Sequence, residues 1–515
     1  VIFGVPISIS VVMVLCGLLT GIVVGAIPGL SGPFAMAVSL PILISVFGVN
    51  ADALLPVVGF LIGIMKGATV GGAVPAILFN TPGTPDALLT TLDGFPMTQK
   101  GQSGKALRVA WFSSATGDTF SDIVLFTTAP FLAVVVEAYL GFTEKAALVL
   151  LSLAFIAVVV GRSVLKGLLA ALFGLFVALI AHGEDTYPRL SLGIPALREG
   201  IPLISAVVGV LILGEVFKAI EDLRREQRSA TKISSFEMLG DNKLRWADIR
   251  RIAPNIGVSA LIGTIIGALP GIGSTLAATM GYEAAKQMSK TPEAFGTGIP
   301  EGVAATEAAN SAVSGANLIP VLSLGIPGNV AAVFIILAME SISGFNPGPG
   351  VFRFNPAEIN RELVMAFGLF TLMMLGNLLN WTIGGVFMRA TGVLIRIPKQ
   401  ILLPVVLLLT LTSVYVEKGH MSSVVIAVIF GFVGYLMRRL EVSVLPFVIS
   451  FILAANLETS MRQAFAASGS DPWFMFKSPI AVAFLMMIAA VIYWFGIRPR
   501  RGRHLTAAIQ NAKGD

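Results

Sequence analysis

The sequence predicts an all-α polytopic membrane protein made of two inverted-topology repeats with broken helices or re-entrant hairpins, plus an extra C-terminal helix. Three observations support this fold class. Of the 515 residues, 55% are hydrophobic and only 12% are charged, whereas ordinary soluble domains carry about 25% charged residues. Paired Pro-Gly motifs interrupt the apolar segments at matching places in two halves of the chain. Apolar runs of membrane-spanning length, about 20 residues, recur at 7–27, 120–141, 146–160, 200–219, 421–437 and 478–496.

The charge and cysteine content exclude several classes of protein. The net charge is +6, but the basic residues flank the ends of apolar runs, which is the positive-inside pattern of membrane proteins. We therefore reject a nucleic-acid-binding function. Cys16, the single cysteine, lies within an apolar run, which excludes a disulfide framework and a cysteine-based metal site. The first apolar segment, Ile7 to Ala26, lacks a basic leader and is predicted to be a retained helix.

The two predicted repeats are residues 1–217 and 252–462. Two motifs of the first repeat align without gaps with two motifs of the second, in the same order and at nearly the same spacing. Gly and Pro are frequent in membrane helices, so a single match could arise by chance, but two ordered matches favour duplication. The aligned pairs are "GIVVGAIPGLSGP" (21–33) with "GTIIGALPGIGST" (263–275), and "VPAILFNTPGT" (74–84) with "IPVLSLGIPGN" (319–329).

Charged loops predict the topology. The polar linker 218–251 between the repeats has a basic excess, which places it in the cytoplasm. Arg438 and Arg439 mark a cytoplasmic loop of the second repeat, whereas the corresponding loop of the first, 182–200, has more acidic than basic residues. Equivalent loops facing opposite sides indicate an inverted repeat.

The C-terminal part has no counterpart in the first repeat. Residues 463–497 are predicted to contain one extra transmembrane helix, from Pro479 to Phe495. Residues 498–515 form a basic tail that begins with Arg498 and is predicted to be a cytoplasmic topology anchor.

The four Pro-Gly interruptions are the candidate substrate site. A helix break leaves backbone amides and carbonyls without helical partners, and in a membrane such groups must be buried in protein or line a wet cavity. Matching breaks in two halves are typical of a transporter's substrate site. The candidate substrate-binding residues are Pro28, Gly29, Ser31, Asn80, Thr81, Pro82, Gly83, Thr84, Pro270, Gly271, Ser274, Thr275, Pro327, Gly328 and Asn329.

Two kinds of ligand fit these breaks. A helix that restarts after a break presents amide N–H groups and a partial positive charge, which suits a carboxylate. Freed carbonyls and hydroxyls also suit Na⁺, for which we expect a site near Ser31, Gly273, Ser274 and Asn310. A nucleotide-phosphate loop is rejected, because no lysine follows the glycines of "PGIGST".

Several ionisable residues lie in apolar surroundings, where such residues are functional by default. Lys66 is either a counter-charge for an anionic substrate or a snorkelling lysine at the interface. Asp86 and Glu301 are candidates for ion coupling, although their positions beside Pro favour capping of helix N-termini. Further candidates for proton or cation coupling are Asp118, Asp122, Glu283, Glu307, Glu340 and the neutral Asn310, whereas His182 and His420 are expected to be solvated.

These motifs together resemble the large membrane subunit, TctA, of the tripartite tricarboxylate transporters. The likeness extends over "GAIPGLSGP", "AILFNTPGTPDALLTTLDGFPMTQKGQSGKAL", "RLSLGIPALREGI", "GALPGIGST", "EGVAATEAANSA" and "IPVLSLGIPGNVAA". The resemblance implies an elevator-like secondary transporter in the bacterial inner membrane that imports small carboxylates, tri- or dicarboxylates, with Na⁺ or H⁺. It also implies a small TctB-type membrane subunit and a periplasmic TctC-type binding protein as partners, and a homodimer is compatible with it.

The sequence departs from the family pattern at two positions, and these differences bear on the identity of the substrate more than on the fold. Lys66 lies in "IMKGATVGG", where the family usually has an aromatic and glycine-rich approach, and Ser311 occupies a position where Asn is common. A passive anion channel or a scaffold subunit without ion coupling is the alternative function. A membrane enzyme is disfavoured, because no catalytic constellation is recognisable in the sequence and no cofactor is expected.

Overall fold

The computed structural model describes residues 9–27, 30–160, 163–180, 190, 200–226, 243–343, 345, 347–352, 360–390 and 399–494, and the regular elements in these ranges are helical. The predicted all-α class is confirmed. Within this described part, eight helices are long and apolar enough to cross a membrane, so the chain is a multi-pass membrane protein. They are Ala51–Phe79, Ser103–Tyr139, Phe142–Val159, Leu203–Asp222, Trp246–Gly267, Arg361–Met388, Met421–Arg439 and Val444–Ala467.

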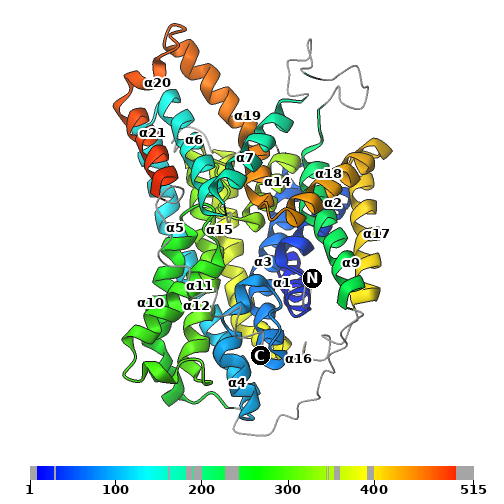
Figure 1. Cartoon of the computed structure of the whole chain (residues 1–515), viewed down its shortest axis with the longest axis vertical. Helices are drawn as coiled ribbons and strands as arrows, with labels where there is room; N and C mark the ends of the chain where they lie inside the picture. The colour runs from blue at the N-terminus through cyan, green and yellow to red at the C-terminus, as the bar shows by residue number, and fades with distance from the viewer. Residues whose placement is uncertain are drawn as a thin grey trace. The chain divides into compact units, whose positions relative to one another are not determined.

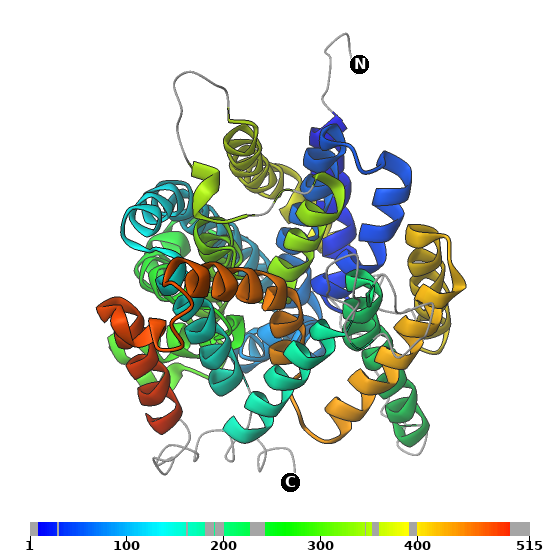
Figure 2. The same ribbon diagram turned by 90° about the horizontal axis from the view of Figure 1, so that it is seen from above.

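The helices form two compact units, and the larger comprises Val1–Tyr139 and Ser191–Arg439. Figures 1 and 2 show α1 beside α3, and α9 beside α17 and α18, within it. Its elements are α1 (Ile9–Gly25), α2 (Gly32–Phe47), α3 (Ala51–Phe79), the 3₁₀ helix η1 (Pro85–Leu88), α4 (Thr91–Gln99), α5 (Ser103–Tyr139), α8 (Leu203–Val208), the π-helical turn η3 (Gly209–Leu213), α9 (Gly214–Glu226), α10 (Trp246–Gly267), α11 (Ser274–Met288), η4 (Pro292–Ala294), α12 (Pro300–Ala316), α13 (Leu318–Leu324), α14 (Val330–Ser343), η5 (Pro349–Phe352), α15 (Arg361–Leu379), the π-helical turn η6 (Asn380–Gly384), α16 (Gly385–Ala390), α17 (Lys399–Lys418) and α18 (Met421–Arg439).

Glycines spaced four residues apart allow α1 and α3 to touch along their backbones. A Cβ atom on Gly21 would lie 2.5 Å from the Ile64 carbonyl oxygen, and one on Gly67 would lie 2.2 Å from the Leu18 carbonyl oxygen. Small residues at this spacing are the common device for close helix packing in membranes, where burial of apolar surface gives little driving force. The glycines in this seam are Gly17, Gly21, Gly25, Gly63, Gly67 and Gly71.

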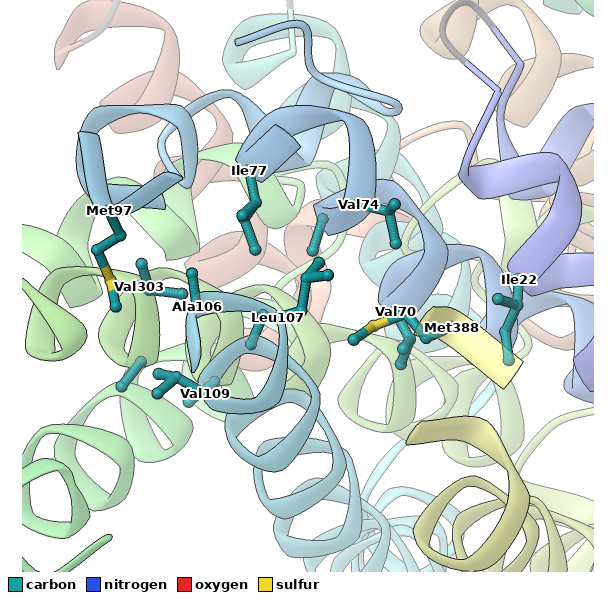
Figure 3. Close-up of a cluster of buried hydrophobic side chains, with 14 of the residues drawn as sticks. Ile22, Val70, Val74, Ile77, Met97, Ala106, Leu107, Val109, Val303 and Met388 are labelled. Carbon is teal, nitrogen blue, oxygen red and sulfur yellow. The ribbon is translucent and has the colours of Figure 1, made fainter. Parts of the chain in front are cut away.

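A buried apolar cluster joins the helices that lead to the breaks. Its side chains come from α1, α3, α4, α5, α10, α12 and α16, and Figure 3 shows several of them meeting between α3, α5 and α12. Ile22, Val74, Met97 and Val303 are fully buried within it. Because such close-packed interiors tolerate little volume change, the cluster fixes the ends of α3 and α12 relative to each other.

Arg438 holds the π-helical turn η3 against α18. Its guanidinium donates hydrogen bonds to the carbonyl oxygens of Val210 (2.7 Å) and Leu211 (2.8 Å) and to the Glu215 carboxylate (2.8 Å). A π-helical turn distorts the regular backbone ladder, and here the arginine binds carbonyls of the distorted segment.

The smaller unit comprises Leu140–Leu190 and Leu440–Asp515. Its described elements are α6 (Phe142–Val159), α7 (Val164–Leu179), α19 (Val444–Ala467), α20 (Phe474–Lys477) and α21 (Pro479–Ile492). Gly174 allows α7 to contact α19, because a Cβ there would lie 2.3 Å from the Phe447 carbonyl oxygen. Helix α21 begins at the predicted Pro479, and the Ser478 hydroxyl caps it by accepting the Ala481 N–H (3.2 Å).

Some sequence predictions fall outside the described residues. These are Pro28 and Gly29 of the first break, His182 with most of the acidic loop 182–200, and the basic tail from Arg498. The predicted linker is described only at its ends, where α9 continues to Glu226 and α10 begins at Trp246.

Candidate substrate site at the helix breaks

The first and second breaks lie against each other. Helix α3 ends at Phe79, and the next residue, Asn80, caps it in a left-handed conformation (φ 52°). The Gly83 N–H donates to the Gly72 carbonyl of α3 (3.3 Å), and a Cβ on Gly83 would lie 2.2 Å from the carbonyl oxygen of Gly25, the last residue of α1. The absence of a side chain at Gly83 therefore permits the contact between the two breaks.

The side chains at these two breaks differ in exposure. Ser31 is half-buried in an extended conformation directly before α2, whereas Thr84 is buried beside Gly72. Asn80 and Thr81 are exposed, and the Thr81 hydroxyl donates to the Phe79 carbonyl (3.1 Å). The second break continues as the short 3₁₀ helix η1 rather than as an α-helix.

The third and fourth breaks also contact each other. After α10, Gly271 and Gly273 have φ angles of 82° and 81°, which are accessible to glycine without steric cost, and α11 begins at Ser274. The Gly271 N–H donates to the Gly328 carbonyl oxygen (2.8 Å). At the fourth break, the Asn329 side chain accepts the Ala332 N–H (2.9 Å) and so caps the first turn of α14.

Polar contacts connect the first pair of breaks with the second pair. The Thr275 hydroxyl, next to the third break, donates to the Asp86 carboxylate in η1 (3.0 Å). The Thr90 hydroxyl donates to the Glu307 carboxylate (2.5 Å), which also accepts from the Ser114 hydroxyl (2.9 Å). The four breaks therefore belong to one connected region of the larger unit.

Asp93 of α4 stabilises this region through hydrogen bonds. Its carboxylate accepts the backbone N–H groups of Gly298 (2.8 Å), Ile299 (3.0 Å) and Gly296 (3.0 Å), and the Tyr282 hydroxyl (2.9 Å). Charge-assisted hydrogen bonds of this kind are about twice as strong as neutral ones. Asp93 thus fixes the loop that leads into α12.

Residues 11–449 match the profile of the tripartite tricarboxylate transporter TctA family. This chain belongs to the TctA family. It is 31% identical over 491 residues to the "Uncharacterized 52.8 kDa protein in TAR-I ttuC' 3'region" of Agrobacterium vitis, covering 94% of this chain and 92% of the relative. It is also 31% identical over 227 residues to the "Uncharacterized protein in TAR-II ttuC' 3'region" of the same organism, covering 43% of this chain and 89% of that protein. No solved structure matches the chain.

The predicted ionisable residues of this TctA protein occupy different environments. Lys66 is fully buried in α3, and its ammonium is shared by Asp118 and Asp122 of α5. Asp86 and Glu301 both lie in the first turn of a helix, as their preference for helix N-termini predicts, and Glu301 accepts from Arg251. Glu283 of α11 and Glu340 of α14 are half-buried, and His420 is exposed before α18.

Buried amides near the breaks include residues that sequence reasoning missed. The Asn310 and Asn317 side chains are 4% and 2% exposed, and the Nδ2 atom of each has no hydrogen-bond partner among the described residues. Asn317 was not predicted, and its Oδ1 lies against Gly328 of the fourth break. The signal that could have identified it is an Asn within a strongly apolar segment just before a Pro-Gly motif.

Proposed function

We propose that this TctA protein is the large permease subunit of a binding-protein-dependent tripartite system. It imports small carboxylates, tri- or dicarboxylates, by secondary-active transport coupled to Na⁺ or H⁺. The observation that carries this proposal is the pairwise contact of the four helix breaks, Gly83 against Gly25 and Gly271 with Gly328. The chain also belongs to a transporter family, which supports a transport function for these contacting breaks.

The carboxylate is held at the breaks by helix N-termini and neutral donors. Helices α2, α11 and α14 restart directly after the first, third and fourth breaks, and the first N–H groups of each lack intrahelical partners. Together with the helix dipole, these groups favour an anion. The Ser274 and Ser31 hydroxyls add hydrogen bonds, and the oxygen atoms around Gly273, Ser274, Ser31 and Asn310 provide the Na⁺ site if Na⁺ is the coupling ion.

Alternating access follows from the repeats. The two halves have inverted topology, and the part that contains the breaks moves as an elevator-like transport domain against the rest of the protein. The protein lies in the bacterial inner membrane with its linker and C-terminus in the cytoplasm. A small TctB-type subunit accompanies it in the membrane, and a periplasmic TctC-type protein delivers the substrate.

Uptake into proteoliposomes tests this function. The chain is reconstituted with the small subunit, the binding protein is supplied outside, and labelled citrate and dicarboxylates are offered with a Na⁺ gradient, a proton gradient, or neither. We expect accumulation that requires the binding protein and one of the gradients. Flux that merely equilibrates would indicate a passive anion channel, and an absence of flux with every carboxylate would indicate a scaffold subunit.

A further inference from the structure

A buried charged cluster lies in the larger unit, where α3, α5 and α15 meet. The Lys66 Nζ atom is 2.7 Å from Asp122 Oδ2 and 3.0 Å from Asp118 Oδ2, and it donates to Asn377 Oδ1 (2.9 Å). The Asn377 Nδ2 atom donates to the same Asp122 oxygen (2.7 Å). The Lys66 side chain is 0% exposed, and the Asp118 and Asp122 side chains are 4% and 1% exposed.

When Lys66, Asp118 and Asp122 are all ionised, the cluster has a net charge and one of its oxygen atoms accepts no hydrogen bond. One ammonium faces two carboxylates, which leaves one negative charge in excess. Both Asp118 oxygens accept hydrogen bonds, from Lys66 and from the Ser314 hydroxyl. Asp122 Oδ1, in contrast, is buried without any partner among the described residues. An unpaired buried charge is strongly disfavoured, whereas a neutral carboxyl group costs far less.

We propose that Asp122 is a proton-binding site, and that the Lys66 cluster takes up and releases one proton there. With the proton on Asp122, the cluster contains one ammonium and one carboxylate and is electrically neutral. With the proton released, it carries a net negative charge within the larger unit.

The packing around Asp122 favours a proton over a metal cation. A Cβ atom on Gly315 of α12 would lie 2.1 Å from Asp122 Oδ1 and 2.6 Å from Ser121 Oγ, so the free oxygen is packed directly against the α12 backbone. A hard metal cation takes several oxygen ligands. The free oxygen at this position belongs to a single carboxylate, which cannot supply that many ligands to a metal cation but can bind one proton.

The helices packed around Asp122 supply no second cation in the described part of the chain. Helix α3 contributes Lys66, and α15 contributes the neutral Asn377. Near Asp122, helix α12 presents Ser314 and Gly315 to α5. The acidic Glu307 of α12 accepts hydrogen bonds from Thr90 and Ser114, away from the cluster. Helix α13 contains no titratable residue, and α15 contains none after Glu362.

The position of the cluster suits a role in ion coupling, and that role rests on the proposed transport function. Helix α3 leads from Lys66 to the second break at Asn80, and the cluster attaches this helix to α5 and α15. Proton release would leave the cluster with one negative charge in excess and the buried Asp122 Oδ1 without a partner among the described residues, which changes the energy of keeping these three helices together. Proton binding itself does not depend on transport.

Infrared spectroscopy of the purified full-length protein tests the proposal without substrate or partners. A protonated carboxylic acid gives a carbonyl band that a carboxylate lacks and that shifts in deuterium oxide. We expect this band in the wild-type protein at neutral pH, and we expect it to decrease by one carboxylic acid in Asp122→Asn. The band should decrease equally in Asp118→Asn. Either substitution leaves one carboxylate opposite the Lys66 ammonium, so the cluster is then neutral without a bound proton.

The control is Glu307→Gln, which removes a buried carboxyl outside the cluster and should leave the Asp122-dependent band in place. Lys66→Met should increase the band, because two carboxyl groups then lack a cation. An absence of the band in the wild-type protein at neutral pH, where ordinary carboxyl groups are ionised, would overturn the proposal, whether or not the variants fold. It would also be overturned by an unchanged band in folded Asp118→Asn and Asp122→Asn, or by Na⁺-dependent thermal stabilisation that both variants lose.

The transport assay separates this site from the proposed function. If the band behaves as expected but uptake does not respond to a proton gradient, the proton site stands and its role in coupling is refuted. If uptake is proton-coupled while the band is independent of Asp122, the transport function stands and this site is refuted.

Discussion

Replacing Gly83 with alanine tests the contact between the first and second breaks. The new Cβ atom would lie 2.2 Å from the Gly25 carbonyl oxygen, 2.8 Å from Pro75 Cγ and 3.0 Å from Gly72 Cα. A carbon–oxygen contact needs about 3.3 Å, so the two breaks must separate by about 1 Å. Gly83 does not have a positive φ angle, and the whole effect therefore comes from this collision. Overpacking of this kind costs about 1–3 kcal/mol.

Thermal unfolding in detergent and carboxylate uptake in proteoliposomes measure the two consequences of Gly83→Ala. We expect a lower apparent Tm and a marked loss of uptake, because the site is displaced as well as destabilised. The matched control is Gly257→Ala in α10, where a new Cβ would meet nothing within 4 Å and the better helix propensity should stabilise by about 0.5–1 kcal/mol. If the two variants have the same Tm and uptake, the breaks do not pack as described.

Three further predictions concern the site and its support. Ser274→Ala should raise the KM for carboxylate uptake with little change in Tm, because Ser274 is half-buried and the N-cap position of α11 is occupied by Gly273. Asn329→Ala should destabilise the protein by about 1 kcal/mol through loss of the α14 cap, whereas Asn329→Asp should keep the cap and still abolish uptake by repelling the carboxylate. Asp93→Asn should cost roughly 1.5–3 kcal/mol, measured by thermal unfolding, because the charged acceptor of the Gly298 N–H and its neighbours is lost.

An unchanged KM in Ser274→Ala removes this serine from the binding site. Normal uptake by Asn329→Asp shows that no anion approaches the fourth break. A wild-type Tm for Asp93→Asn shows that the loop before α12 is held by other contacts, and Tyr282→Phe, which loses one hydrogen bond to Asp93, provides the graded comparison at about 1 kcal/mol.

The helix breaks were predictable because their signals are local. Proline removes a helical hydrogen bond and glycine permits left-handed backbone, so "GALPGIGST" predicts the end of α10 and the start of α11 without tertiary information. The positive φ angles of Gly271 and Gly273 agree with that reasoning. The same local logic did not reveal that the second break continues as a 3₁₀ helix, in which Asp86 accepts a hydrogen bond from Thr275 of α11, far away in the sequence.

Long-range pairing could not be predicted from local patterns. Asp118 and Asp122 are four residues apart and share a helix face, which suggests a joint role, but nothing in the sequence indicates that Lys66 is their partner. Asn377 is separated from Lys66 by more than 300 residues of chain and lies in an ordinary apolar helix. The inverted relation of the two repeats and the elevator motion stay predictions.

The central claim is that the four breaks of this TctA protein form one carboxylate site. The most direct test is an electron cryo-microscopy map of the full chain with citrate or a dicarboxylate present at saturating concentration. The account predicts ligand density at the start of α11 and α14, within hydrogen-bonding distance of Ser274 and beside Gly328 and Gly83. Density for the carboxylate at any other place in the protein, with the breaks unoccupied, would contradict it.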